Sequence, residues 1–181
     1  MDIAAILHSY DGKRVAPFRE VAEALLERPG RGNGSIGHLV ALAASEETAL
    51  QTGATWVLKY LAERGVAPRD GEAVALLRLL RRPLASDALL HLLQTLPHMD
   101  LAADLPAGEE GTLHRALLRL IESDRVFVRA WAYNGLGLLA VRNAALRAEI
   151  EGLLRRAERT ETAAVKVRVR HARAALRRQS R

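Results

Sequence analysis

Residues 163–178, AAVKVRVRHARAALRR, fit two secondary structures, and the choice between them decides the fold. Read in alternation, Val165, Val167 and Val169 are separated by basic residues, which is the pattern of a half-buried β-strand. Read with the helical period, an apolar stripe runs from Val165 through Val169 to Leu176. Beside it runs a second, basic stripe of Lys166, Arg170, Arg173 and Arg177. The rest of the sequence favours the helix, because this stretch belongs to one copy of an internal repeat.

Each copy of the repeat begins at a hydroxyl residue followed by an acidic residue. The four pairs are Ser45-Glu46, Ser86-Asp87, Ser123-Asp124 and Thr160-Glu161, at spacings of 41, 37 and 37 residues. A hydroxyl at the N-cap accepts a hydrogen bond from an early helical N–H, and an acid in the first turn meets the positive end of the helix dipole. Each pair therefore predicts the start of a helix, which we call a capped helix.

The residues that follow the pairs agree in three of the four copies. Apolar or small residues recur five, nine, twelve and sixteen positions after the hydroxyl, which is the spacing of one helical face. They are Leu50, Ala54, Val57 and Leu61, then Val128, Ala132, Gly135 and Leu139, then Val165, Val169, Ala172 and Leu176. The second copy is shorter and stops at Pro97. Residues 163–178 are therefore predicted to be helical, like their counterparts in the other copies.

A further amphipathic segment precedes each capped helix. The apolar stripes of these segments are Leu39/Leu42, Ala73/Leu76/Leu77/Leu80, Leu113/Leu117/Ile121 and Leu146/Ile150/Leu153. An earlier pair of helices is indicated at residues 2–10 and 15–27, and Gly65 followed by Pro68 marks a helix end. The pattern predicts an all-α chain in which helices come in pairs.

Helical pairs at about 37–41 residues resemble HEAT repeats. The copy SDRVFVRAWAYNGLGLLA, residues 123–140, is the most similar, with Asp124 and the pair Val128-Arg129 placed as in the second helix of that family's unit. In the first copy Gln51 stands where the basic residue is expected. The resemblance covers roughly residues 35–180. It implies a right-handed α-solenoid, an α-α superhelix of about five stacked antiparallel helical hairpins in a single domain of residues 1–181. The second helices would line its concave side.

Two stretches interrupt the helical pattern. PGRGNGS, residues 29–35, lacks the preceding strand and the terminal Gly-Lys-Ser/Thr of a phosphate-binding loop, so it is predicted to be an inter-helix loop. Residues 97–111, PHMDLAADLPAGEEG, are predicted to form a long irregular loop with four acids and no cation. That loop is either a solvated linker or a contact for a basic partner or for the chain's own basic C-terminal part.

Composition excludes several classes of chemistry. The chain has no cysteine, which excludes disulfides, thiol catalysis and zinc sites built on sulfur, and which suits a cytoplasmic location. No signal peptide and no apolar run of membrane-spanning length is apparent. None of the six histidines stands at a metal-ligand spacing, and no serine lies in a nucleophile elbow. We therefore predict a protein without enzymatic activity, cofactor, metal, membrane partner or small-molecule substrate.

Positive charge is concentrated near the C-terminal end. Residues 142–181, the basic C-terminal repeat, contain 12 Lys or Arg and four acids, net +8, whereas residues 1–141 contain 15 and 17, net −2. Such asymmetry indicates an acidic partner and says nothing of the fold. The candidate anion-binding residues are Lys166, Arg170, Arg173 and Arg177. They are either a solubilising face on an end repeat or a surface for nucleic-acid phosphates or an acidic protein.

The aromatic residues and two arginines of the capped helices form a second candidate set. Trp, Tyr and Arg are enriched at the energetic centres of protein interfaces, whereas the structural alternative is core packing between repeats. The partner-binding candidates are Trp56, Tyr60, Arg125, Arg129 and Tyr133.

An enzymatic alternative also follows from the resemblance, since some HEAT-like proteins are DNA glycosylases that act on alkylated purines. Membership would imply a catalytic carboxylate beside aromatics on a basic concave face. One turn after Trp56 stands Tyr60, and one turn after Trp131 stands Gly135, so neither place carries Asp or Glu.

The sequence therefore favours a scaffold or adaptor that docks a partner protein on a curved helical-repeat surface. Nucleic-acid binding by the basic C-terminal repeat is the alternative. A glycosylase, or a HEAT-like lyase or chaperone subunit that works with another chain, ranks behind both.

Overall fold

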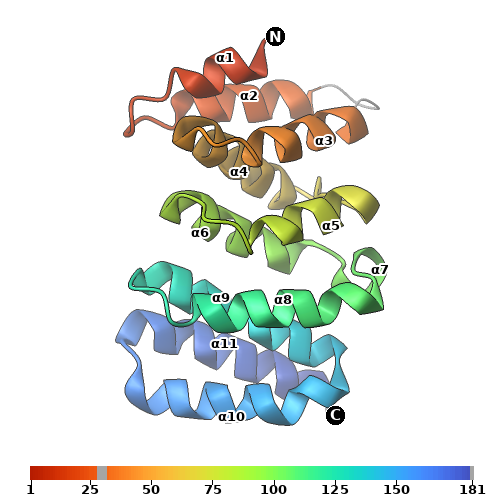
Figure 1. Cartoon of the computed structure of the whole chain (residues 1–181), viewed down its shortest axis with the longest axis vertical. Helices are drawn as coiled ribbons and strands as arrows, with labels where there is room; N and C mark the ends of the chain where they lie inside the picture. Colours follow the sequence, from red (N-terminus) through yellow and green to blue (C-terminus); the bar gives the residue numbers. More distant parts are fainter. Residues whose placement is uncertain (28–31, 180–181) are drawn as a thin grey trace. The chain divides into compact units, whose positions relative to one another are not determined.

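The computed structural model describes residues 1–27 and 32–179 of the 181-residue chain. All regular elements in these two ranges are helices, which confirms the all-α prediction (Figure 1). The chain forms two compact units, unit 1 at Met1–Asp100 and unit 2 at Leu101–Arg181. Each unit is described by itself below.

Unit 1 is built around the first capped helix. Its elements are α1 (Ile3–His8), α2 (Ala16–Leu26), α3 (Gly32–Ala43), α4 (Thr48–Ala62), α5 (Asp70–Leu79), α6 (Ser86–Thr95) and the short 3₁₀ helix η1 (Leu96–His98). α4 packs against α1, α2, α3 and α6, and ten of its residues are buried. As predicted from Gly65, α4 ends in a turn where this glycine adopts a φ of 86°, a left-handed conformation that costs glycine nothing.

Unit 2 is built in the same way around the third capped helix. Its elements are α7 (Leu101–Asp104), α8 (Ala107–Leu120), α9 (Val126–Arg142), α10 (Ala144–Thr160) and α11 (Ala163–Gln179). α9 packs against α8, α10 and α11. Residues 163–178 lie within α11, where Val165, Val169 and Leu176 are buried, so the helical interpretation of this stretch is confirmed.

The hydroxyl–acid pairs mark helix starts less directly than predicted. α4, α9 and α11 each begin three residues after the hydroxyl, and only α6 begins at the hydroxyl itself, Ser86. Ser45 Oγ accepts from the N–H of Glu47 at 3.1 Å, and Ser123 Oγ accepts from the N–H of Arg125 at 3.2 Å. The N-cap prediction is therefore wrong for all four residues. The hydroxyls of Ser45 and Ser123 close the turn before the helix, Ser86 follows the N-cap Ala85, and Thr160 is the last residue of α10.

The side chain six positions after the hydroxyl braces this turn. Gln51 Nε2 donates to the carbonyl of Ser45 at 2.8 Å, and Arg129 Nη1 donates to the carbonyl of Ser123 at 2.7 Å. Glutamine and arginine thus brace the same turn in two copies of the repeat, although only arginine is charged. The carbonyl of a half-buried turn residue thereby gains a side-chain donor in each case.

The same two side chains also connect each capped helix to the next one within its unit. Gln51 Oε1 accepts from the N–H of Ala85, directly before α6, at 3.0 Å. Arg129 Nε lies 3.5 Å from Glu161 Oε1, between α10 and α11. The turn before one capped helix is thereby tied to the turn before the following one, by a neutral bond in unit 1 and by a half-buried ion pair in unit 2.

The structure corrects the two loop predictions. Residues 97–111 are not one long irregular loop, because they include the end of η1, all of α7 and the start of α8. Leu101 and Leu105 are buried there, and these apolar anchors order the stretch. In the predicted loop 29–35, residues 32–35 belong to α3, and the prediction for 29–31 lies outside the described residues.

Candidate functional site

In unit 1 the predicted residues Trp56 and Tyr60 belong to a row of four aromatic rings. Trp56 and Tyr60 stack with their ring centroids 5.1 Å apart, and Trp56 packs against Phe18 of α2 at 5.9 Å. Phe18 in turn packs against Tyr10 at 4.5 Å. Phe18 is fully buried, whereas Trp56 and Tyr60 are half-buried. The row therefore anchors α2 on α4 and leaves part of three residues, Tyr10, Trp56 and Tyr60, accessible.

The accessible side of Tyr60 already has partners in the chain. The guanidinium of Arg64 lies 3.4 Å from the centre of its ring, and the hydroxyl donates to Glu23 Oε1 at 3.3 Å. Lys59 Nζ lies 5.5 Å from the centre of the Trp56 ring. These contacts support the core-packing interpretation of the two aromatics, because cation–π and hydrogen-bonding capacity is used within unit 1.

In unit 2 the other three partner-binding candidates lie in and next to the first half of α9. Arg125 is exposed, Arg129 is half-buried and tied to Ser123 and Glu161, and Tyr133 is only 7% exposed. Burial, followed by the nearby Glu161, raises the pKa of Tyr133. Tyr133 is thus mostly enclosed in unit 2 and Arg129 is engaged in internal contacts, which favours the core-packing alternative for these two residues. The five candidates also belong to two different units.

Loss of the Arg129 contacts should destabilise unit 2. We expect Arg129→Met to lower the free energy of unfolding by roughly 1.5 kcal/mol, because the Ser123 carbonyl and the Glu161 carboxylate both lose a donor. Arg129→Gln should lose less, since Gln51 braces the equivalent turn in unit 1. Urea unfolding followed by circular dichroism measures both variants, and equal losses would contradict the equivalence of the two copies.

The basic stripe of α11 occupies positions that are buried in the other capped helices. Lys166, Arg170, Arg173 and Arg177 stand six, ten, thirteen and seventeen residues after Thr160. The same positions are Gln51, Thr55, Leu58 and Ala62 in α4, and Arg129, Tyr133, Leu136 and Ala140 in α9. All but the half-buried Arg129 are buried, and in each unit the first of them reaches the next capped helix. The stripe therefore stands at positions that α4 and α9 largely bury, and Gln51, Thr55 and Arg129 connect them to the following copy.

The four cations of the stripe differ in how far they are used within unit 2. Arg173 forms an ion pair with Glu158 of α10, and Lys166 Nζ donates to the carbonyl of Arg159 at 3.2 Å. Arg170 is exposed, and its Nε donates to the carbonyl of Lys166 at 3.2 Å. Arg177 is exposed as well. The stripe is thus a partly organised cationic surface rather than a row of freely solvated side chains.

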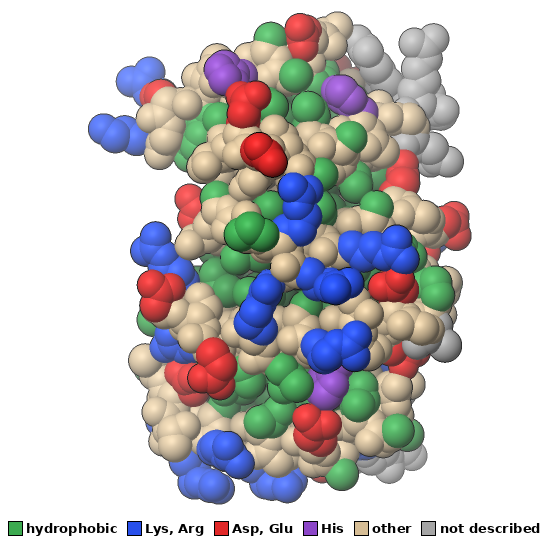
Figure 2. Space-filling view, in the orientation of Figure 1, with side chains coloured by type: hydrophobic (Ala, Val, Ile, Leu, Met, Phe, Trp, Pro, Cys, Tyr) green, Lys and Arg blue, Asp and Glu red, His purple; other side chains and the backbone are tan. Residues whose placement is uncertain are grey.

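Sequence reasoning missed the arginines of α10 that adjoin the stripe. Arg155, Arg156 and Arg159 are all exposed, and the contact between Lys166 and the Arg159 carbonyl joins the end of α10 to α11. In Figure 2, blue side chains gather over the α10 edge of unit 2. These arginines contribute to the net charge of +8 over residues 142–181, but the sequence alone does not place the end of α10 beside the stripe.

A second arginine of α11 has a specific role. The guanidinium of Arg168 lies 3.8 Å from the centre of the Trp131 ring, both residues standing eight positions after their hydroxyl. Phe127, one turn before Trp131, is 63% exposed. The i, i+4 spacing of Phe127 and Trp131 was visible in the sequence, whereas the arginine that covers the indole was not.

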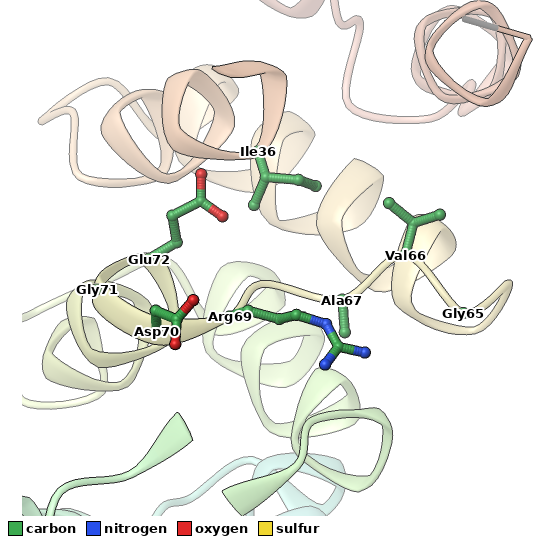
Figure 3. Close-up of a pocket in the computed structure, with 8 residues that line it drawn as sticks. All are labelled: Ile36, Gly65, Val66, Ala67, Arg69, Asp70, Gly71 and Glu72. Carbon is green, nitrogen blue, oxygen red and sulfur yellow. The ribbon is translucent and has the colours of Figure 1, made fainter. Parts of the chain in front are cut away.

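An open pocket in unit 1 lies between α3 and the start of α5 (Figure 3). Ile36, the turn of residues 65–67 and Arg69–Glu72 line it, and Glu72 points toward Ile36. Burial raises the pKa of Glu72, and Asp70 adopts a φ of 49°, the one non-glycine residue with positive φ in the described ranges. The Arg69 side chain extends toward Ala67, away from the carboxylates of Asp70 and Glu72 (Figure 3), and none of the described residues that line the pocket is Ser, Thr, Cys or Lys. Sequence reasoning missed the pocket because turn residues form its walls.

His91 of α6 is the most perturbed titratable group of unit 1. Its Nδ1 lies 3.3 Å from Oγ1 of the fully buried Thr55, which itself donates to the carbonyl of Gln51 at 2.7 Å. Burial, reinforced by Lys59 and opposed by Asp87, lowers the pKa of His91 to about 4. His91 is therefore a neutral packing residue between α4 and α6.

This pKa predicts an acid-sensitive unit 1. Above the unfolded-state pKa of 6.5 His91 is neutral in both states, and as the pH falls toward 4 only the unfolded state takes up the proton. We expect the free energy of unfolding to fall by roughly 2 kcal/mol between pH 7 and pH 4 from this group. His91→Asn should flatten that part of the pH profile in urea unfolding, and an unchanged slope would contradict the assignment.

The part of the chain that the structure describes contains no group of three or more His, Asp, Glu or Cys side chains arranged to hold a metal ion. None of its helices combines the length and apolar character needed to cross a bilayer. Comparison of the chain with protein-family models, with curated proteins and with solved structures finds no match.

Proposed function

We propose that this chain is a non-enzymatic adaptor that docks a partner protein on a helical-repeat surface, and that the basic stripe of α11 is its docking surface. One observation carries the proposal. The stripe stands at four positions that α4 and α9 bury or half-bury, the first of which reaches the turn before the following capped helix, and here all four are cations. A face built for helix packing is thus presented with a charge that favours an acidic partner.

We infer from the repeat that the chain is a HEAT-like, right-handed α-solenoid of about five hairpins, and we expect a cytoplasmic location. The order of the helices and the packing of successive capped helices in each unit, α4 on α6 and α9 on α11, support the inference. So does the brace formed by Gln51 in one copy and Arg129 in another. Solenoids of this kind stack each hairpin on its neighbours, so the face that is buried in one copy is suited to accept a helical element in another.

The test is affinity capture from the native cell with wild-type protein and with two charge variants. The stripe variant is Lys166→Gln/Arg170→Gln/Arg177→Gln, and the control variant is Lys13→Gln/Arg14→Gln/Arg19→Gln. All six positions are outside the core, and both variants lose three positive charges. Arg173 is kept because it pairs with Glu158.

The proposal requires that a specific protein partner, identified by mass spectrometry, is retained by wild type and by the control variant and lost by the stripe variant. Direct binding of that purified partner then has to show the same dependence. A partner set that is identical for all three proteins would rule out the stripe as the docking surface.

Nucleic-acid binding is the second candidate function, and the exposed arginines Arg155, Arg156 and Arg159 beside the stripe favour it. Contacts dominated by phosphates weaken with salt, with a log–log slope of about −0.9 per neutralised phosphate on duplex DNA. If the protein is neither retained on heparin nor able to shift duplex or single-stranded oligonucleotides at ~50 mM salt, this candidate is excluded.

A further inference from the structure

We propose that the partner presents an acidic α-helix to the basic stripe, with carboxylates repeated along one face at steps of four, three and four residues. This inference rests on the proposed function and adds the chemistry of the occupant. Lys166, Arg170, Arg173 and Arg177 define the spacing, because they are separated by those steps along α11. A helix lying along α11 repeats its own side chains with the same rise per residue, so four contacts can form in register.

Unit 2 contains an ion pair at the α9 position equivalent to the first position of the stripe, formed there with a carboxylate in the turn before α11. Six positions after the hydroxyl, Arg129 of α9 reaches the carboxylate of Glu161 in the next copy, at 3.5 Å, with both side chains 17% exposed. Lys166 stands at that position in α11. A carboxylate on the partner, placed where Glu161 stands relative to α9, would give Lys166 the partner that Arg129 already has.

The stripe carries a cation where other capped helices carry a buried leucine, which argues against an apolar partner helix. Leu58 in α4 and Leu136 in α9 are fully buried at the position of Arg173, thirteen residues after the hydroxyl. An apolar helix packed on α11 would bury cations without a counter-charge, at a cost of several kcal/mol per ion. A helix that brings carboxylates to these positions removes that cost, because each buried cation gains an ion pair.

The immediate surroundings favour a protein carboxylate over a phosphate strand. Arg173 already pairs with the carboxylate of Glu158, so the stripe contains one cation whose partner is a protein carboxylate. Three of the four stripe side chains also donate to, or pair with, groups of unit 2. These contacts hold the cations close to α11 instead of extended away from it. No aromatic side chain belongs to α11 for stacking on bases.

The experiment uses three synthetic helical peptides of equal length on the intact protein. The first carries four glutamates on one face at the stated steps, the second carries the same glutamates distributed around the helix, and the third has glutamine in their place. Binding is measured by fluorescence anisotropy of labelled peptide at ~50 mM salt, with wild type, the stripe variant and the control variant. Circular dichroism checks that both variants and all peptides keep their helical content.

We expect wild type and the control variant to bind the one-faced acidic peptide about tenfold more tightly than the other two, and the stripe variant to lose that preference. Equal affinity for both acidic peptides, or binding that the stripe variant leaves unchanged, would overturn the inference. So would stronger binding of a duplex oligonucleotide that displaces the peptide, which would assign the stripe to phosphates. Absence of peptide binding overturns the acidic helix alone, since capture of a stripe-dependent partner tests the adaptor function separately.

Discussion

Phe18→Ala is expected to lower the free energy of unfolding of unit 1 by about 3–5 kcal/mol. The Phe18 side chain is fully buried, and its ring centroid lies 4.5 Å from that of Tyr10 and 5.9 Å from that of Trp56. Its edge also covers Gly53 of α4, where an added Cβ would lie 2.9 Å from Phe18 Cε1. Removal of the ring therefore opens a cavity between α2 and α4 that a glycine cannot fill.

The two tryptophans make the measurement specific, because Trp56 belongs to unit 1 and Trp131 to unit 2. In a Trp131→Phe background, urea unfolding followed by indole emission reports Trp56, which packs on Phe18 directly. The matched control is Phe127→Ala, at the chain's other phenylalanine, which is 63% exposed. Because Phe127 lies in unit 2, this control is followed by Trp131 emission in a Trp56→Phe background. That control should change stability by no more than about 0.5 kcal/mol, and similar losses for the two variants would contradict the buried placement of Phe18.

The helical core of the capped helices could be predicted from the sequence. The apolar positions of α4, α9 and α11 recur at steps of four, three and four residues, and the structure buries Leu50, Val128 and Val165 alike. Periodicity of this kind reports which face meets the core, because burial of that face is what selects the side chains. The same argument separated helix from strand in residues 163–178.

Other features depend on what packs against one particular copy. Eight positions after the hydroxyl stand Gly53, Trp131 and Arg168. In α4 the missing side chain of Gly53 lets Leu7 of α1 and Phe18 of α2 pack closely. In unit 2 the guanidinium of Arg168 covers the indole of Trp131. The local sequence does not indicate which element packs against each of these residues, so the alignment of copies alone could not predict the contacts. The helix within 97–111 was missed for a similar reason, since burial of Leu101 and Leu105 outweighs a loop-like composition.

The candidate site was predicted in part. The spacing of Lys166, Arg170 and Arg177 placed them on one helical face, and the structure keeps them at the surface or half-buried. The sequence already shows that these residues correspond to particular positions of α4 and α9. Only the structure shows that Gln51 and Arg129, at two of these positions, contact the turn before the next capped helix. Long-range pairing of polar side chains depends on the angle between helices, which local sequence does not specify.

Gly137→Ala is expected to lower the free energy of unfolding of unit 2 by about 3 kcal/mol, although alanine is the better helix former. A Cβ at Gly137 of α9 would lie 2.5 Å from Ala172 Cβ and 3.1 Å from Ala172 Cα of α11. The obstacle is backbone and a first side-chain carbon, which cannot rotate away. The two helices must therefore separate, and the packing around the buried Val169 and Leu176 loosens with them.

Gly152→Ala in α10 is the matched control, because its new Cβ would meet only Arg155 Nη2, at 3.9 Å. There the helix propensity of alanine should raise the free energy of unfolding by about 0.5–1 kcal/mol. Identical substitutions in two helices of one unit are thus expected to have opposite signs, measured by urea unfolding with Trp131 emission in a Trp56→Phe background. Since separation of α9 from α11 also shifts Arg168 from the Trp131 ring, Gly137→Ala should change the native emission of Trp131 as well. A stable variant with unchanged emission would show that the close approach of the two helices does not exist.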